Sequence, residues 1–475
     1  MNWFKKYFCD AGFWRVALRL AIPIALQNLL ISSFSLIDTL MVGQLGDVAL
    51  SAVGMAGQWS WLLNIALFGV ISGTSLYISQ YWGVRDINGI HHTYGIALTS
   101  AVLISAVFML AGLLIPNGIV SVFNRDPAII DAGTAYLSIA ALSYPAVAMS
   151  NILSTVLRST ERVKLPLAVS GITAVFNALF NYALIFGKFG FPAMGVRGAA
   201  LATVISSWMG PILILLISFC QKNILITSPA RLFRFKRAQV GAFYRRAAPV
   251  ILNESLWGLG TLIFNVIFSN LGYEYYAAVT IHKTFENIAF VFFVGFCNAC
   301  CIMVGKSIGA GKVERAVLDS RRFTMLIPAV SVVIGALIIL FRAQLVSVFN
   351  MGGNISALTQ QTAQWILLVY GLELPMRNIP YIMIVGIFRS GGDTVTGMKL
   401  DLFSQWALSI PATFLAAFVF KLPFIAVFAI MYIFEDYLKS FLCLRHFLSD
   451  RWIHPVTEEG RRGYAEYCSR RTDKT

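Results

Sequence analysis

Long apolar stretches separated by short polar connections run through almost the whole chain. A membrane-spanning helix needs about 20 mostly apolar residues. Stretches of about this length occur at residues 17–42, 52–80, 95–115, 134–157, 166–187, 198–219, 247–271, 276–304, 323–341, 363–388, 400–420 and 424–446. The pattern predicts an all-α integral membrane protein with twelve transmembrane helices, joined by short loops except at 220–246.

Composition agrees with a membrane protein along most of the chain. Of the 475 residues, 58% are hydrophobic and only 12% are charged, and the mean hydropathy is +0.73. A soluble globular domain carries about 25% charged residues. No early cleavage site follows the first apolar stretch, so we expect this stretch to be an anchor helix rather than a removed signal peptide.

The basic residues are distributed unevenly between the two sides of the membrane. The chain has 37 Lys and Arg, 22 Asp and Glu, and a net charge of +15. Most of the bases lie in the N-terminal segment, near residues 85, 158–164, 220–246, 306–322 and 389–399, and in the tail from Lys439 onward. This positive-inside distribution predicts a multi-pass protein of the cell (inner) membrane with both termini cytoplasmic. It accounts for the charge without a nucleic-acid partner.

An internal repeat divides the chain into two halves. The pentapeptide VSVFN occurs at 120–124 and again at 346–350, an offset of 226 residues. Pro23 and Pro249 stand at the same offset, as do Gly69 and Gly295, and the offset drifts to 231 between Arg158 and Arg389. The repeat predicts two pseudo-symmetric six-helix lobes, in domains at 1–220 and 247–446. Between and after them we expect a basic cytoplasmic linker at 221–246 and a cytoplasmic tail at 447–475.

Six spans separate equivalent positions, so both lobes have the same orientation in the membrane. Two such lobes are related by an axis along the membrane normal, and their rocking gives alternating access in secondary transporters. Neither half contains the G-x-x-x-x-G-K-[ST] motif of a P-loop. We therefore expect a transporter that is not driven by ATP at a P-loop, and not an enzyme.

A single carboxylate interrupts the first apolar stretch, in SLIDTLMVGQLGD at 35–47. Asp38 follows a run from Leu20 to Ile37 without any charge, and a charge at a helix centre costs about 3 kcal/mol on insertion scales. Polar company in the first half comes from Asn151, Asn177, Asn181 and Thr203. Amides and hydroxyls can ligate Na⁺ or hydrogen-bond a carboxyl in either protonation state. Asp38 is therefore a candidate site for Na⁺ or H⁺; the alternative is an Asp at a helix end that reaches the headgroup layer.

Charged side chains in the second half are spaced to pair along one helix. Lys283 and Glu286 are three residues apart, and Glu373 and Arg377 are four apart, spacings that place both partners on one helix face. We expect each pair to neutralise itself, in a structural role or lining a cavity. Lys283 and Arg377 are the basic residues assigned to spans. Glu254 has no base nearby in the sequence and is a separate candidate.

Several motifs resemble the multidrug and toxic compound extrusion (MATE) family. They are DTLMVGQLGDVALSAVGMA at 38–56, LRSTERVKLPL at 157–167, NALFNYALIFG at 177–187, GVRGAALATVIS at 195–206 and FRSGGDTVTGM at 388–398. The resemblance covers almost the whole chain. It implies an antiporter that exchanges Na⁺ or H⁺ for exported small organic, often cationic, drug-like compounds. It further implies a monomer among membrane lipids, with no cofactor beyond the coupling ion.

The resemblance assigns roles to residues of the first half. Asp38 matches the first-helix acid implicated in cation coupling in the DinF-like branch, and a Na⁺ ion is expected there if sodium is the coupling ion. Asn177 and Thr203 match polar residues of the same site, whereas Asn181 stands where that branch often has a second Asp.

The second half departs from the NorM-like branch of the family. Trp257 replaces the seventh-helix Glu of that branch, and Asn378 aligns with its tenth-helix Asp. The chain is thus predicted to be closer to the DinF-like branch. A sodium site in the second lobe would need Glu254 as a substitute.

Two other functions compete with the exporter. A flippase of the same superfamily would move a lipid-linked precursor, but such proteins usually have extra helices and a strongly cationic cavity. A membrane scaffold or receptor has little use for a pseudo-symmetric repeat with a lone buried acid. We therefore favour the exporter.

Overall fold

The computed structural model describes residues 10–349 and 356–472, and this part of the chain is helical almost throughout. Its one β-type contact is an isolated bridge between Gly392 and Ile453. The predicted all-α class is confirmed.

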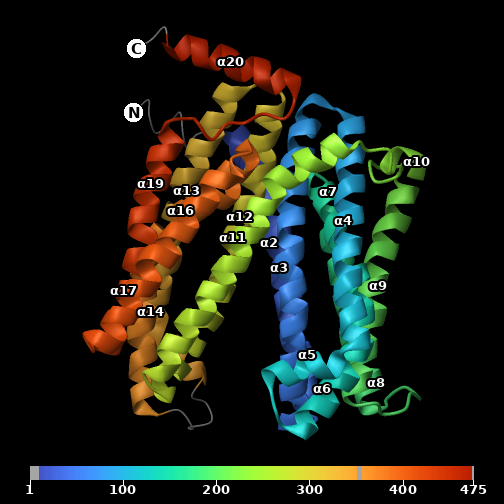
Figure 1. The fold of residues 1–475 in the computed structure, drawn as a ribbon, viewed down its shortest axis with the longest axis vertical. Helices are drawn as coiled ribbons and strands as arrows, with labels where there is room; N and C mark the ends of the chain where they lie inside the picture. The colour runs from blue at the N-terminus through green and yellow to red at the C-terminus, as the bar shows by residue number, and fades with distance from the viewer. Residues whose placement is uncertain (1–9, 350–355, 473–475) are drawn as a thin grey trace. The chain divides into compact units, whose positions relative to one another are not determined.

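The helices of the first half follow the predicted spans (Figure 1). They are α2 (Ala11–Gly43), α3 (Asp47–Val84), α4 (Ile87–Leu114), α6 (Pro127–Ala140), α7 (Tyr144–Ser159), α8 (Lys164–Phe186) and α9 (Val196–Cys220). The 3₁₀ turn η1 (Ala141–Ser143) joins α6 and α7 into one span, and the short α5 (Pro116–Phe123) connects α4 to α6. Asp126, whose side chain accepts the backbone N–H of Ala128, and Pro127 at the first helical position start this span, as expected for a capped helix N-terminus.

The second half repeats the arrangement with more irregular helices. It contains α11 (Arg237–Asn270), α12 (Tyr273–Gly309), α13 (Val313–Phe349), and α14 (Ala357–Tyr381) with η2 (Ile382–Phe388) and α15 (Arg389–Gly391). Then follow α16 (Thr394–Leu402), η3 (Phe403–Ser409), α17 (Ile410–Phe414) and η4 (Leu415–Val419) as one span. The last span comprises α18 (Phe424–Tyr432), η5 (Ile433–Tyr437) and α19 (Leu438–Leu448). Stretches η2 to η5 are π-helical turns, which often occur at functional sites.

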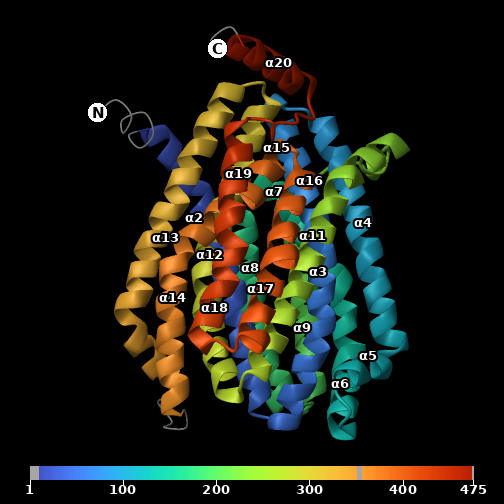
Figure 2. The ribbon, with the colours of Figure 1, turned by 60° about the vertical axis from the view of Figure 1, so that its left-hand side comes forward.

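Ten of the described helices are long and apolar enough to cross a membrane. The two further spans, 357–391 and 424–448, contain the charged residues Glu373, Arg377, Arg389, Glu435, Asp436 and Lys439. The ten helices and these two segments together account for the twelve predicted spans. Within the second half, α13 and α14 lie side by side in both views (Figure 2).

The chain forms two compact units whose boundaries fall inside α2 and α11. Unit 1 comprises Met1–Ala25 and Leu252–Thr475, and unit 2 comprises Leu26–Ile251. Each boundary lies two residues after a proline, Pro23 in α2 and Pro249 in α11. Proline removes a helical hydrogen bond and kinks or breaks a helix. The division at the linker, with domains at 1–220 and 247–446, describes the repeat and stays a prediction.

Close helix contacts through glycine repeat in both units. A Cβ on Gly69 would lie 2.1 Å from Cγ1 of Ile251 in unit 2, and one on Gly295 would lie 2.9 Å from Cβ of Ala25 in unit 1. Gly69 and Gly295 are equivalent at the offset of 226, and so are Ala25 and Ile251. Small residues let helix backbones approach closely in membranes. The repeat is therefore present in the packing as well as in the sequence.

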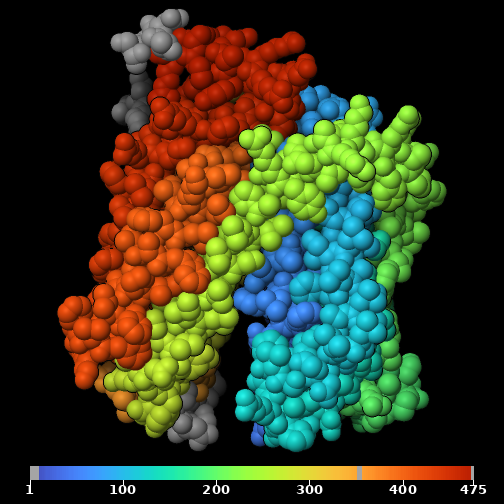
Figure 3. All heavy atoms as spheres, viewed as in Figure 1, coloured from blue at the N-terminus to red at the C-terminus, as the bar shows by residue number. Residues whose placement is uncertain are grey.

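The C-terminal segment packs on one end of unit 1. Trp452 is fully buried, with its carbonyl oxygen so close to Gly391 that a Cβ there would lie 2.4 Å away. Thr457 donates to the carbonyl of Gly309 at 2.7 Å, and α20 (Glu458–Thr472) continues across α12 and α13. In Figure 3 this segment, in red, forms the outer layer at that end of unit 1.

Candidate functional site

Asp38 of α2 lies at one end of a chain of amides in unit 2. The Nδ2 of Asn181 donates to Oδ1 of Asp38 at 2.5 Å and to Oδ1 of Asn177 at 3.2 Å. Asn177 in turn donates to Oγ of Ser206 at 2.9 Å. Three helices, α2, α8 and α9, thus contribute to one hydrogen-bonded chain.

The local sequence explains how these hydrogen-bonded side chains come together. Asn177 and Asn181 are one helical turn apart on α8 and face the same side. Helices α8 and α9 approach closely because Gly198 has no side chain: a Cβ there would lie 2.4 Å from the carbonyl oxygen of Leu184. Val42, Ile185 and Ala199 form an apolar cluster at the ends of α2, α8 and α9. These contacts hold the polar residues of the three helices together.

The electrostatics of Asp38 are unusual because its partner is neutral. Among the described residues, no basic side chain pairs with Asp38, and Asn181 is completely buried. The Oδ1 of Asn181 has no hydrogen-bond partner in the described part of the chain. A carboxamide can donate through nitrogen to a carboxylate or, when rotated, accept through oxygen from a protonated carboxyl. The pair therefore suits a group that gains and loses a cation.

Two further polar residues belong to this region and are absent from the predicted set. Ser206 accepts the last hydrogen bond of the chain, from Asn177. Tyr136 of α6 lies close enough to Asp38 to interact with it electrostatically, and the Tyr136 hydroxyl is hydrogen-bonded to Thr203. Thr203 itself donates to its own helix, at the carbonyl of Ala199. Ser206 stands three residues after Thr203, so helical spacing could have identified it. Tyr136 has no such signal, because its approach depends on how α6 packs.

Asn151, a lower-ranked prediction, lies apart from this chain of amides. It is half-buried on α7, where its main-chain carbonyl accepts a hydrogen bond from Thr155 at 2.7 Å. Among the contacts of the described residues, none joins Asn151 to Asp38.

In unit 1, Glu254 has a basic partner that is distant in the sequence. Arg389 of α15 donates through Nη2 to Oε1 of Glu254 at 2.5 Å. The guanidinium side chain is 5% exposed and the carboxylate 23%. The two residues are 135 positions apart in the sequence. A search for bases near Glu254 in the sequence therefore does not find this ion pair.

Among the described residues, no close ion pair joins Lys283 to Glu286 or Glu373 to Arg377, although the charges of Lys283 and Glu286 still attract each other. Arg377 of α14 pairs with Glu286 of α12 at 2.6 Å instead of Glu373. Lys283 donates to Oδ1 of Asn265, and Glu373 accepts from the hydroxyl of Tyr437 at 3.1 Å. Residues one turn apart on a helix can pair only weakly, and contacts with facing helices determine the partners here.

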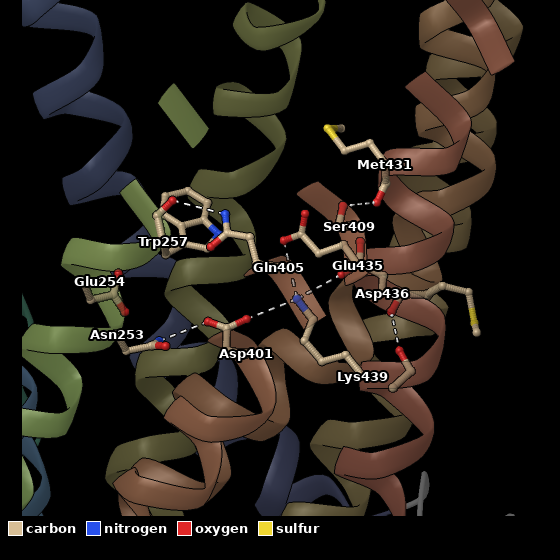
Figure 4. A network of polar contacts seen from close by, with 12 residues as sticks. Asn253, Glu254, Trp257, Asp401, Gln405, Ser409, Met431, Glu435, Asp436 and Lys439 are labelled. Carbon is tan, nitrogen blue, oxygen red and sulfur yellow. Dashed lines mark hydrogen bonds and ion pairs between the residues drawn. The ribbon is translucent and has the colours of Figure 1, made fainter. Parts of the chain in front are cut away.

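A larger charged cluster in unit 1 is absent from the predicted set (Figure 4). Lys439 of α19 lies 3.2 Å from Asp401, 3.2 Å from Asp436 and 3.6 Å from Glu435. The lysine side chain is only 7% exposed. Lys439, counted with the basic residues of the tail, is thus a buried residue of α19, and its side of the membrane stays a prediction. Arg389, placed in a cytoplasmic segment by its charge, is buried as well.

Comparison with known proteins identifies the family. A family model described as MatE matches residues 23–183 and again residues 249–415. This chain belongs to the MATE family. The two matches follow the two halves of the repeat, and together they cover more than half of the chain. As a MATE protein it is a multi-pass membrane transporter.

Curated relatives of similar length are transporters by name. A probable multidrug resistance protein NorM of Thermotoga maritima is 26% identical over 440 residues, 92% of either chain. The uncharacterized transporter YisQ of Bacillus subtilis is 24% identical and matches 91% of this chain and 93% of its own. Names and identities at this level leave the choice between the DinF-like and NorM-like branches undecided.

Solved structures share the fold at low sequence identity. A crystal structure of MATE in the bent conformation superposes with a TM-score of 0.84 at 17% identity, covering 96% of this chain and 97% of the other. The Vibrio cholerae MATE transporter VcmN in the bent form gives a TM-score of 0.83 at 17% identity, with coverage of 94% and 100%. The two-lobed twelve-helix architecture of this MATE transporter is thus the fold of its family.

Proposed function

We propose that this MATE transporter is a secondary active antiporter that exports small organic, often cationic, compounds in exchange for Na⁺ or H⁺. It acts as a monomer in the cell (inner) membrane with both termini cytoplasmic. The observation that carries the proposal is the contact between Asp38 and Asn181, a carboxylate whose partner is a neutral carboxamide. The name of the Thermotoga maritima relative, a probable multidrug resistance protein, supports the substrate class.

Coupling follows from the cost of leaving Asp38 charged without a cation. A carboxylate in an apolar span is destabilised unless a proton or a metal ion neutralises it. When Na⁺ or H⁺ binds, Asn181 can turn its oxygen toward the bound cation, and the site becomes neutral. A cationic substrate and the coupling cation then compete to neutralise Asp38. Export of the substrate therefore depends on entry of Na⁺ or H⁺.

The position of Asp38 favours the DinF-like type of coupling. The acid lies in unit 2 with Asn177 and Asn181, whereas Glu254 in unit 1 is occupied by Arg389. A NorM-like site that relied on Glu254 would have to compete with a guanidinium for the carboxylate. Coupling through unit 2 needs no such competition.

The flippase alternative is disfavoured by how the bases of unit 1 are held. Arg377 and Arg389 each contact a carboxylate, and Lys439 contacts three. Bases neutralised in this way do not make the strongly cationic cavity expected for a lipid-linked anionic precursor.

Efflux from proteoliposomes tests the proposal. Sodium and proton gradients are imposed separately on wild type and Asp38→Asn, with a fluorescent organic cation as cargo. We expect one gradient to drive wild-type efflux and neither gradient to drive efflux in the variant. Undiminished coupled efflux in Asp38→Asn would overturn the role of Asp38, and scrambling of labelled lipid without efflux would favour the flippase.

A further inference from the structure

An arginine of unit 2 lacks the carboxylate partner that its counterpart in unit 1 has. Arg158 of α7 is equivalent to Arg389 of α15, and Arg389 pairs with Glu254 at 2.5 Å. Among the described residues, Arg158 makes one side-chain hydrogen bond, from Nη2 to Oγ1 of Thr155 at 3.3 Å. Its side chain is half-buried, and a guanidinium stays charged in proteins. A charge withdrawn from water is costly without a partner of opposite charge.

Unit 2 itself supplies no anion to Arg158. Its six acidic residues are Asp38, Asp47, Asp86, Asp126, Asp131 and Glu161, and in the described part of the chain none of them pairs with Arg158. Glu161, the nearest in sequence, accepts a hydrogen bond from the indole of Trp82 at 3.3 Å. Asp86 caps the N-terminus of α4. An anion at Arg158 therefore has to come from a ligand.

The repeat indicates which residue stands beside Arg158. In unit 2, Nε2 of Gln27 donates to Oγ of Ser170 at 3.0 Å. At the offsets of 226 and 231, the equivalent residues of unit 1 make the equivalent contact, from Asn253 to Asp401, also at 3.0 Å. The next residues along α2 and α11 are Asn28 and Glu254. The amide of Asn28 thus stands where unit 1 has the carboxylate that binds an arginine.

The two arginines remain equivalent although their spans differ in length by one residue. The offset is 230 between Pro145 and Pro375 and 231 between Arg158 and Arg389. The π-helical stretch η2 lies between Pro375 and Arg389. A π-helical turn, with its i→i+5 hydrogen bond, accommodates an additional residue in a helix. The insertion thus leaves Arg389 at the position in unit 1 that Arg158 has in unit 2.

Asn28 and Arg158 have the donors that an anion needs. Asn28 is half-buried, and its side chain has no hydrogen bond among the described residues. Its amide nitrogen can donate to a carboxylate or phosphate oxygen. A guanidinium binds such anions in a planar fork of two parallel N–H donors. The contact of Arg389 with Glu254 shows that this position of the fold can hold a carboxylate.

We propose that Arg158 and Asn28 form a binding site in unit 2 for the carboxylate or phosphate group of a ligand. The anionic group of the ligand takes the place that the Glu254 carboxylate has in unit 1. One unpaired guanidinium binds one such group and does not make the strongly cationic cavity of a flippase. Binding at this site does not rest on the proposed antiport.

Calorimetric titration of the purified full-length protein in detergent tests this binding without any gradient. The probes are benzoate, inorganic phosphate and a short-chain phosphatidylglycerol, all at one ionic strength. We expect at least one probe to bind once per chain, and Arg158→Gln to weaken its binding by about tenfold or more, as the loss of a charge-assisted hydrogen bond does. Binding of benzoate or phosphate identifies a soluble ligand, and binding of the lipid alone identifies a headgroup.

Three further variants make this test specific. Arg162→Gln removes the same charge from an exposed position four residues later, and we expect it to leave the affinity unchanged. Asn28→Glu supplies Arg158 with a carboxylate of its own, as Glu254 does for Arg389. This variant should abolish binding of the probe and raise the unfolding temperature. Asn28→Gln keeps a neutral amide and should not raise the unfolding temperature.

The proposal is overturned if none of the three probes binds, or if Arg158→Gln and Arg162→Gln weaken binding equally. Should Arg158→Gln fail to fold, Asn28→Glu decides the point, since probe binding retained in that variant would overturn the site. If the wild-type protein exports nothing from proteoliposomes, the proposed antiport fails, and the titrations still decide whether Arg158 binds an anion.

Discussion

The two units place an aspartate beside a buried asparagine in different electrostatic surroundings. In unit 2, Asp38 has amides and hydroxyls around it, and its direct partner is Asn181. In unit 1, Asp401 contacts Asn253 on one oxygen and Lys439 on the other. The first arrangement leaves one charge to be neutralised from outside, whereas the second places three acids around one base. Two halves with the same fold thus surround a buried aspartate in different ways, with neutral groups in unit 2 and with a lysine in unit 1.

The repeat also shows that equivalent positions of the two halves can differ in charge while the fold stays the same. Asp38 is equivalent to Phe264, and Glu254 is equivalent to Asn28. The glycine contacts at Gly69 and Gly295, by contrast, occur in both halves. Packing is shared by the two units, whereas the ionisable groups differ.

The largest expected effect is the loss of coupling in Asp38→Asn without a comparable loss of stability. Asparagine has nearly the volume of aspartate, and its carbonyl oxygen still accepts a hydrogen bond from Asn181. We expect the free energy of unfolding to change by less than about 1 kcal/mol, while coupled efflux falls to the passive leak. Thermal unfolding in detergent and proteoliposome efflux measure the two quantities. A variant that unfolds readily would show that Asp38 is a structural residue.

The next effect compares equivalent arginines. Arg389→Met leaves the Glu254 carboxylate without its ion pair, and removing one partner of a buried pair costs about 3–5 kcal/mol. Arg158→Met, the matched variant in unit 2, removes a hydrogen bond to Thr155 and should cost about 1 kcal/mol. Thermal unfolding measures both changes. Equal losses would mean that the two units do not differ in how they hold charge.

Equal effects are expected where the units share packing. Gly69→Ala and Gly295→Ala each insert a methyl group into a contact between helices, and overpacking costs about 1–3 kcal/mol. Gly57→Ala serves as the control, because nothing lies within 4 Å of a Cβ at that position. A large effect at only one of the two equivalent glycines would contradict shared packing. Thermal unfolding of the three variants decides the point.

The smallest effect is expected at Ser170, a neutral residue that stands 231 residues before Asp401, the offset also found between Arg158 and Arg389. Ser170→Ala removes the hydrogen bond from Gln27 and should reduce the free energy of unfolding by about 1 kcal/mol. Thermal unfolding in detergent measures the change, and a loss as large as that expected for Arg389→Met would show that Ser170 does more than accept this hydrogen bond.

The sequence predicted the polar contacts of the protein less well than its helices. The twelve helices were predictable because each needs only a sufficiently long apolar stretch. The amide chain at Asp38 was partly predictable, since Asn177 and Asn181 are one turn apart and an isolated Asp is conspicuous in an apolar run. The C-terminal segment was predicted only as a cytoplasmic tail, and its polar sequence gave no indication that Trp452 is fully buried.

By itself, the sequence determined the helical class, the repeat and the isolation of Asp38 along its own helix. Only the tertiary structure decided which charged residues of different helices pair: Glu254 with Arg389, Glu286 with Arg377, and Lys439 with Asp401. The reason is physical. A hydrophobic span is specified by its own residues, whereas the partner of a buried charge is the nearest opposite charge in space. Helix packing brings Arg389 to Glu254 across 135 positions of the sequence, and the spacing along one helix does not reveal such a partner.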